Sequence, residues 1–173
     1  MRRAEGFSLL ETLVAVSVFA VGIGSLAQLI VLATHLNQRS KAVTVAALLA
    51  QEKIEQLKAV AWGTDLLGFT VTDVTSDTAV LPEAGSGGTG LAPSPANALK
   101  ENTEGYCDFA DGSGRLLAGG GVPRETSFVR RWSITALSAN TLLIQVHVLG
   151  RSQTSTSGVL ARMATVRARR GIQ

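Results

Sequence analysis

The chain has 173 residues, which is enough for one small globular domain once an apolar N-terminal stretch is set aside. Its formal net charge of +3 is too small to argue for nucleic acid as the main partner. The single cysteine, Cys107, excludes an intramolecular disulfide, so a domain outside the cytoplasm must rely on its hydrophobic core. We expect Cys107 to be an inert, half-buried thiol.

Charge is spread unevenly along the chain. From Arg124 onward there are eight arginines and one acidic residue, Glu125, whereas the preceding part carries eight basic and twelve acidic residues. The C-terminal part is therefore near +7 and the remainder near −4. We expect the two parts to attract each other.

The first element in chain order is an apolar segment. No charged side chain occurs from Thr12 to Thr34, and about 20 apolar residues suffice for a helix to cross a bilayer. A secretory signal peptide is disfavoured because its apolar region is only about 7–15 residues long. An ordinary signal anchor fits the length, but it gives no reason for Glu11, since a carboxylate in a membrane span costs up to about 2.5–3.5 kcal/mol. The sequence therefore predicts a membrane helix in which Glu11 has a cationic partner.

The N-terminal residues RRAEGFSLLETLVA resemble the cleavage and methylation signal of type IV pilin-like precursors. That signal is a short basic leader ending in glycine, then phenylalanine, with glutamate as the fifth residue after the cut; Glu5 is less typical of such a leader. The resemblance implies that a membrane prepilin peptidase cleaves between Gly6 and Phe7 and methylates the new amine of Phe7. This amine, on the same or a neighbouring subunit, is then the expected assembly charge partner of Glu11, since a buried ion survives only when paired. Gly6 lacks a Cβ, which lets the backbone lie extended and close in a peptidase groove.

The apolar segment continues into an amphipathic helix. Apolar residues follow a step of seven and then alternating steps of four and three along one seam: Leu36, Val43, Ala47, Ala50, Ile54, Leu57 and Ala61. Polar residues are expected on the other faces: Gln51, Glu52, Lys53, Glu55, Gln56 and Lys58. The spacing of Glu55 and Lys58 allows a weak surface ion pair.

The pattern predicts one long helix over roughly 7–61, ended by Gly63. Gly22 and Gly24 interrupt its apolar half. They are either tolerated small residues or positions where neighbouring helices pack closely.

The region 63–127 is predicted to consist of loops. All four prolines lie between Pro82 and Pro123, and ten of the 18 glycines lie between Gly85 and Gly121. The segments EAGSGGTGLAPSPANA and LLAGGGVP favour no helix or strand. GSGGTG does not have the flanking strand and helix of a phosphate-binding loop. DFADGSG, residues 108–114, misses the spacing of a calcium loop, so we expect a surface turn there.

The region 128–173 is predicted to be antiparallel sheet. FVRRWSIT, LLIQVHVL and VLARMATV alternate in side-chain character and are joined by short polar turns, which favours a three-stranded meander. One face can pack on the amphipathic half of the helix, which gives an α+β fold. His147 is expected on the face opposite Val146 and Val148, and neither it nor His35 belongs to a metal or catalytic pattern. The arginines near the end are expected on a solvated strand face and tail, with an adhesive or DNA-contacting patch as the alternative: Arg162, Arg167, Arg169 and Arg170.

GYCDFADGSG, FVRRWSIT and LLIQVHV are similar to the type IV pilus modification protein family usually called PilV, whose members are minor pilins. The resemblance implies an α+β, type IV pilin-like fold and a structural subunit, processed and N-methylated, that helps prime or modify pilus assembly. Its partners would be the prepilin peptidase, other minor and major pilins and the inner membrane. It divides the chain into a leader (1–6), a transmembrane or filament-core half (7–34) and an amphipathic half (35–62) of the helix, the loop region (63–127) and the sheet part of the head (128–173).

The resemblance also implies a location in the bacterial inner membrane, with the N-terminus cytoplasmic and the head periplasmic, and later in the pilus; the basic residues that flank the apolar segment leave the orientation undecided. One alternative is a minor pseudopilin (I-type) of a type II secretion system, a class with a usually smaller head. Another is an enzyme or ligand-binding domain on a plain signal anchor. The sequence offers no nucleophile with a base, no metal-ligand spacing and no carboxylate pair for an enzyme, so no cofactor, metal or small-molecule substrate is expected.

Overall fold

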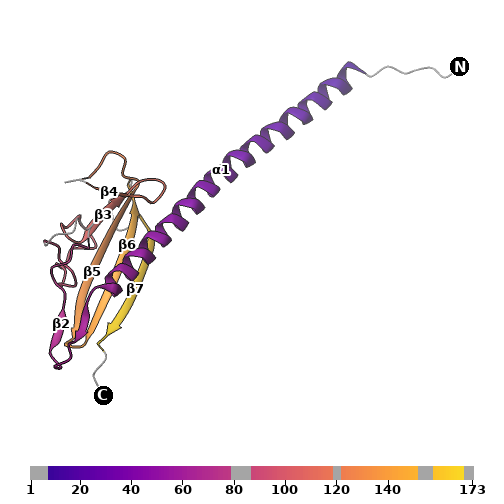
Figure 1. Ribbon diagram of the computed structural model, residues 1–173. Helices are drawn as coiled ribbons and strands as arrows, with labels where there is room; N and C mark the ends of the chain where they lie inside the picture. The colour runs from indigo at the N-terminus through magenta and orange to yellow at the C-terminus, as the bar shows by residue number, and fades with distance from the viewer. Residues whose placement is uncertain (1–7, 79–86, 119–121, 152–157, 170–173) are drawn as a thin grey trace. The chain divides into compact units, whose positions relative to one another are not determined.

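The computed structural model describes residues 8–78, 87–118, 122–151 and 158–169 (Figure 1). The chain forms two compact units, Met1–Lys41 and Ala42–Gln173. One helix, α1 (Leu9–Ala59), contributes residues to both. We call the second unit the head.

The first unit consists, in its described part, of the N-terminal portion of α1. Its large apolar side chains are exposed along the whole portion, and α1 is long and apolar enough to cross a membrane. Four side-chain hydroxyl groups each donate a hydrogen bond to the carbonyl oxygen four residues earlier in the helix: those of Thr12, Ser17, Ser25 and Thr34. A Cβ added at Gly22 or Gly24 meets no atom of the described chain within 4 Å, so packing within one copy does not require either glycine.

The remainder of α1 packs on the head's sheet through one face. Its buried residues are spaced by one, three or four: Ala46, Leu49, Ala50, Lys53, Ile54 and Leu57. The predicted seam is confirmed at Ala50, Ile54 and Leu57, whereas Val43 is 40% exposed and Ala61 is exposed. The seam was wrong at its ends because a spacing of 3.5 residues drifts around a helix of 3.6 residues per turn. The expected surface pair is confirmed, with Lys58 Nζ 3.0 Å from Glu55 Oε1.

The helix ends at Ala59, and Gly63 lies instead in strand β1 (Trp62–Thr64). The prediction that Gly63 ends the helix was therefore wrong. Arg167 satisfies the final turn, because its Nη1 donates to the carbonyl oxygens of Leu57 (3.2 Å) and Val60 (2.9 Å). A cation is favourable there because the C-terminal end of a helix carries partial negative charge.

The Trp62 ring lies close to two arginines, Arg167 near the end of β7 (Val159–Ala168) and Arg169 just after it. The guanidinium of Arg167 lies 5.4 Å and that of Arg169 lies 4.9 Å from the Trp62 ring centroid. Arg169 also donates to Thr72 Oγ1 at 2.8 Å. The expectation of a solvated arginine face was wrong at these two positions, and Arg170 lies outside the described residues.

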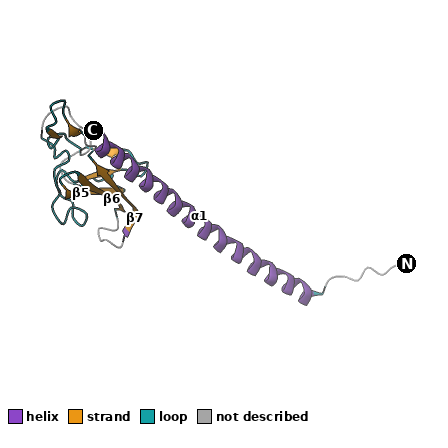
Figure 2. Cartoon of the chain, turned by 90° about the horizontal axis from the view of Figure 1, so that it is seen from below, coloured by secondary structure: helices purple, strands orange, loops and turns teal. Residues whose placement is uncertain are grey.

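Five antiparallel strands form the main sheet in the order β4-β3-β5-β6-β7 (Figure 1). Figure 2 shows β5, β6 and β7 in this order. Their bounds are β3 (Cys107–Ala110), β4 (Leu116–Leu117), β5 (Phe128–Ser138), β6 (Thr141–Gly150) and β7 (Val159–Ala168). The predicted meander is confirmed as β5, β6 and β7, and the α+β fold is confirmed with it. The prediction that residues 63–127 form only loops was wrong, because β2, β3, β4 and all of β1 except Trp62 lie in this region. A separate two-stranded sheet pairs β1 with β2 (Thr70–Thr72).

The core lies between α1 and one face of the main sheet. Trp132 of β5 is fully buried there, together with alternate residues of β6: Leu142, Ile144, Val146 and Val148. His147 lies between two of these and is only half-buried, as expected for the opposite face. The segment 87–106 continues along β5 beyond β3, since Trp132 N donates to Tyr106 O (3.0 Å) and Ser94 N donates to Ile134 O (3.0 Å).

Two glycines of the GSGGTG segment let two loops pack backbone to backbone. A Cβ at Gly88 would lie 2.1 Å from the Asp77 Cα, and one at Gly90, whose φ is +48°, would lie 2.4 Å from the Asp73 carbonyl oxygen. Any larger residue would force these loops apart. These glycines have a structural role in the head.

Candidate functional site

The N-terminal portion of α1 carries the first candidate site. Glu11 lies in the first turn of the helix and its side chain is exposed. A carboxylate is favourable at this end because the first backbone N–H groups carry partial positive charge. Gly6 and Phe7, the expected cleavage and methylation residues, lie outside the described residues.

Glu11 is surrounded by exposed apolar side chains. Leu10, Leu13 and Val14 are each at least half exposed. A continuous apolar surface of this kind marks contact with lipid or with other protein. The local chemistry is therefore one carboxylate on an apolar helix, whose surroundings must supply a cation once water is removed.

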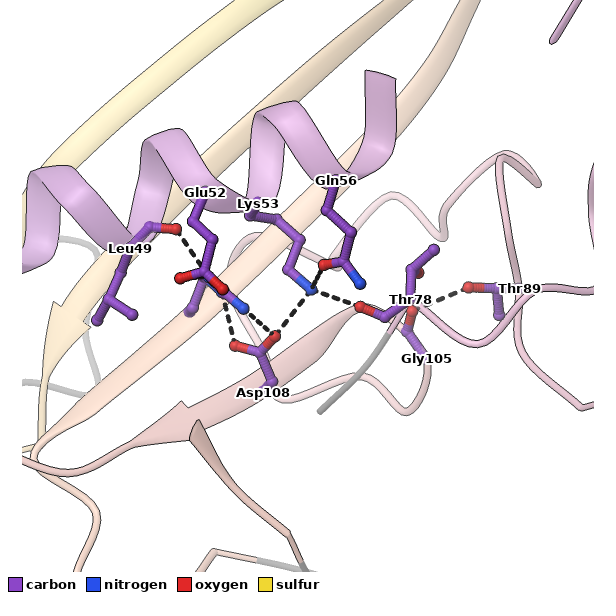
Figure 3. A network of polar contacts seen from close by, with 9 residues as sticks. Leu49, Glu52, Lys53, Gln56, Thr78, Thr89, Gly105 and Asp108 are labelled. Atoms are coloured by element: carbon purple, nitrogen blue, oxygen red, sulfur yellow. Dashed lines mark hydrogen bonds and ion pairs between the residues drawn. The ribbon is translucent and has the colours of Figure 1, made fainter. Parts of the chain in front are cut away.

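A buried ionic cluster in the head is the second candidate site (Figure 3). We define it as Lys53 of α1, Asp108 of β3 and Arg130 of β5, whose side chains are at most 1% exposed. Lys53 Nζ lies 2.9 Å from Asp108 Oδ2. Arg130 binds both oxygens of the same carboxylate, with Nε to Oδ1 and Nη2 to Oδ2 each at 2.8 Å. Such a bidentate pair fixes both the distance and the orientation of the two groups.

The remaining donors of the cluster also have partners. Lys53 Nζ donates to Gln56 Oε1 at 2.8 Å and to the Thr78 carbonyl oxygen, and it lies 4.0 Å from the Trp132 ring centroid. Arg130 Nη1 donates to the Leu49 carbonyl oxygen at 2.8 Å. The Asp108 carboxylate of β3 thus joins α1 to β5, and Lys53 connects the cluster to the loop at Thr78.

The cluster contains more positive than negative charge. Two cations share one fully buried carboxylate, and the nearest further acid, Glu52, lies 3.5 Å from Arg130 Nη1 with its side chain 60% exposed. The pKa of Lys53 is lowered from 10.5 to about 8, chiefly by burial and in part by the charge of Arg130, while Asp108 opposes the shift. Lys53 is therefore charged at neutral pH but loses its proton far more readily than a surface lysine.

This arrangement suits a structural role. The donors and the carboxylate of the cluster are occupied with one another and closed to solvent, so no polar atom of it is presented to a substrate. In the part of the chain that the structure describes, no group of three or more histidine, cysteine, aspartate or glutamate side chains could hold a metal ion.

The patterns in the sequence did not predict the cluster. Lys53 was expected on the polar face of the helix and Asp108 in a surface turn, and both expectations were wrong. The available signal was Arg130, which alternates in phase with Phe128 and Trp132 and so had to face the core. A buried arginine requires a carboxylate nearby, and the adjacent strand supplies it.

The expected turn is present, but it begins at Asp111, after β3 has ended at Ala110. Asp111 Oδ1 accepts hydrogen bonds from the backbone N–H groups of Ser113 (2.8 Å) and Arg115 (3.0 Å). These bonds close the hairpin between β3 and β4. The Ser113 hydroxyl also donates to Asp111 Oδ1 at 2.6 Å, and this hydrogen bond is the main reason that the pKa of Asp111 lies below its usual value. The DFADGSG segment is therefore half strand and half turn.

Cys107 and His147 lie in one row across the outer face of the sheet, in register with Arg131 and Arg162. Cys107 is half-buried, and burial raises the pKa of its thiol, with a smaller contribution from Asp108. This is the environment of an unreactive thiol. Burial also lowers the pKa of His147, and the charges of Arg162 and Arg131 lower it further.

Comparison with known proteins bears on the N-terminal segment. Residues 1–27 match the family model described as the prokaryotic N-terminal methylation motif. The chain carries a prepilin-type signal. No curated protein and no solved structure gives a significant match to the chain. The motif is that of processed subunits of type IV pilin or pseudopilin type, which are structural proteins, and the apolar α1 fits membrane anchoring.

Proposed function

We propose that this chain is a minor type IV pilin of the PilV kind, a processed and N-methylated structural subunit that helps prime or modify pilus assembly. The observation that carries the proposal is the position of Glu11, five residues after Gly6 in the matched motif and at the start of a helix with an exposed apolar surface. Cleavage after Gly6 by a prepilin peptidase would create a cationic, methylated amine at Phe7. That amine supplies the cation that Glu11 needs.

Assembly then follows from the energetics of the apolar helix. In the inner membrane, lipid covers the exposed side chains of α1, and the head lies on the periplasmic side. In a filament, the helices of neighbouring pilins cover the same surface. Pairing of Glu11 with the Phe7 amine of a neighbour removes the cost of burying either ion alone, and so favours the aligned register of subunits.

A minor pseudopilin of a type II secretion system would use the same signal and helix. The size of the head favours the pilin, because β3 and β4 extend the meander and β1 and β2 form a second, separate sheet, whereas the pseudopilin class usually has a smaller head. Deletion of the gene separates the two. We expect loss or shortening of surface pili with normal export of secreted enzymes, and the reverse result would identify a pseudopilin.

The role of Glu11 is tested by Glu11→Ala and Glu11→Val, with Gln28→Leu as a control that also removes a polar group from the apolar helix. We expect all three variants to insert in the membrane and to be cut after Gly6. The two Glu11 variants should fall by about tenfold or more in the sheared filament fraction, which corresponds to about 1.4 kcal/mol of lost pairing free energy. Recovery of the Glu11 variants at the level of Gln28→Leu would rule out the charge pair.

A further inference from the structure

The hairpin that follows α1 ends in an exposed apolar tip. We define the tip as Leu66, Leu67 and Phe69, of which Leu66 is 103% and Leu67 is 81% exposed. The turn is well fixed, because Asp65 Oδ1 accepts hydrogen bonds from the backbone N–H groups of Leu67 (2.9 Å) and Phe69 (2.8 Å). Gly68, with φ +84°, provides the left-handed residue that the turn requires. A turn that holds three apolar side chains in water is suited to contact with another molecule.

An open groove lies elsewhere on the head. Its volume is about 720 Å³, and its apolar lining comes from Ala42, Phe128 and Leu160. Ser127 and Arg151 are also part of its lining. Arg151 is exposed, and it donates from its backbone N–H to the Ser127 carbonyl oxygen at 2.8 Å. The groove therefore combines an apolar interior with a positively charged side chain.

The tip and the groove belong to opposite ends of the head. The tip follows Ala59 at the C-terminal end of α1, whereas the groove includes Ala42 and the residues where β5 begins and β6 ends. At 1.5 Å per residue, these two positions on α1 are about 25 Å apart. The two surfaces cannot meet within one copy, but they can meet between two copies in a head-to-tail contact. Such a contact leaves a free tip and a free groove at its ends, so it can repeat without closing.

Charge favours the same pairing. Asp65 lies at the base of the tip and Arg151 at the groove, so a docked tip brings a carboxylate toward a guanidinium. Two tips facing each other would instead place like charges together. We propose that the apolar tip of one copy docks in the groove of a second copy of this chain. This inference makes a second copy of the chain a partner in the assembly proposed above. It rests on the proposed function only in placing the contact in a pilus.

Cysteine cross-linking of the detergent-solubilised full chain tests the contact, in a Cys107→Ser background. A chain with Leu66→Cys and Arg151→Cys carries one cysteine at each surface. We expect oxidation to give a ladder of dimers, trimers and larger species on a non-reducing gel. A mixture of the two single variants should give dimers without a ladder, because each chain then has one cysteine.

Two further variants control the experiment. Leu66→Cys with Ala164→Cys places the second cysteine at an exposed position of β7 that does not line the groove, and should give a several-fold weaker ladder. Leu66→Cys with Ser127→Cys approaches the groove from another lining residue and should restore the ladder if Arg151→Cys disturbs the site. The proposal is overturned by the absence of a ladder from both groove variants, by an equal ladder from the Ala164 control, or by tip-to-tip dimers of Leu66→Cys alone as the main product.

The N-terminal residue is determined on the same preparation, co-expressed with the peptidase. A chain that begins at methylated Phe7 without a ladder overturns the docking contact and leaves the proposed function standing. A ladder from a chain that keeps Met1 to Gly6 supports the docking contact and overturns the proposed function.

Discussion

Asp108 is the residue on which the buried cluster depends. It is the one fully buried acid in contact with both Lys53 and Arg130 in the described head, so its removal leaves two buried cations without a counter-ion. We expect Asp108→Asn to lower the free energy of unfolding by about 3–5 kcal/mol. Chemical denaturation of the detergent-solubilised chain, followed by tryptophan fluorescence, measures the change.

Glu55→Gln is the matched control for Asp108→Asn. Glu55 also pairs with a lysine, but both side chains of that pair are largely exposed. We expect a loss below about 1 kcal/mol, because water screens an exposed pair. Equal effects of the two substitutions would mean that the cluster does not stabilise the head.

Lys53 gives the stability of the head a characteristic pH dependence. The folded state releases the Lys53 proton near pH 8 and the unfolded state near 10.5, so the unfolded state binds more protons in this interval. Stability contributed by Lys53 should therefore rise from pH 8 to 10.5, by up to about 3 kcal/mol. The charged groups that face Lys53 are Asp108, Arg130 and Glu52.

Denaturation midpoints between pH 7.5 and 10.5 measure this effect in a Cys107→Ser background. The background is needed because the raised pKa of Cys107 acts with the opposite sign: the folded state holds that proton longer, and stability falls as pH rises. Lys53→Met is the control and should abolish the rise. A rise that persists in Lys53→Met would assign the pH dependence to another group.

At the scale of elements, the orientation of α1 on the sheet depends on its buried face. Leu57 is fully buried there, whereas Leu48 on the same helix is 62% exposed. We expect Leu57→Ala to cost about 2–5 kcal/mol of unfolding free energy, because it leaves a cavity in the core. Leu48→Ala should change it by less than about 0.5 kcal/mol. Thermal denaturation of both variants tests the orientation, and a reversal of the two effects would show that the helix presents the other face.

The long helix and the β5-β6-β7 meander were predictable because their signals are local. Alternation in FVRRWSIT or LLIQVHVL needs only neighbouring residues to be recognised. The end of α1 was not predictable in this way. Its last carbonyls are satisfied by Arg167, far along the chain on β7, so a local rule chose Gly63 instead.

Of the two candidate sites, one is local in sequence and was predictable, and the other depends on contacts between distant segments and was not. Gly6, Phe7 and Glu11 form a linear motif, and their spacing is visible in the sequence alone. Lys53, Asp108 and Arg130 come from three elements distant in sequence, and rules of thumb place charged residues on the surface. Only the register of β3 against β5, which pairs Asp108 with Arg130, brings the cluster together.

At the scale of the whole molecule, the two units have different requirements. The described part of the first unit exposes apolar side chains that need lipid or other helices, whereas the head has its own core around Trp132. A chain built in this way can exchange the environment of its helix without unfolding its head. In the proposed function, processing at the N-terminus is the step that would make this exchange possible, because it would create the cation that we propose as the partner of Glu11.

The most direct test of this account is the intact mass and N-terminal residue of the protein from bacterial membranes, with and without the prepilin peptidase. We predict a chain that begins at N-methylated Phe7 only when the peptidase is present, and a chain that retains Met1 to Gly6 in its absence. A chain that keeps its first six residues under both conditions, or one cut near Ala33 by signal peptidase, would contradict the account and leave Glu11 without its proposed partner.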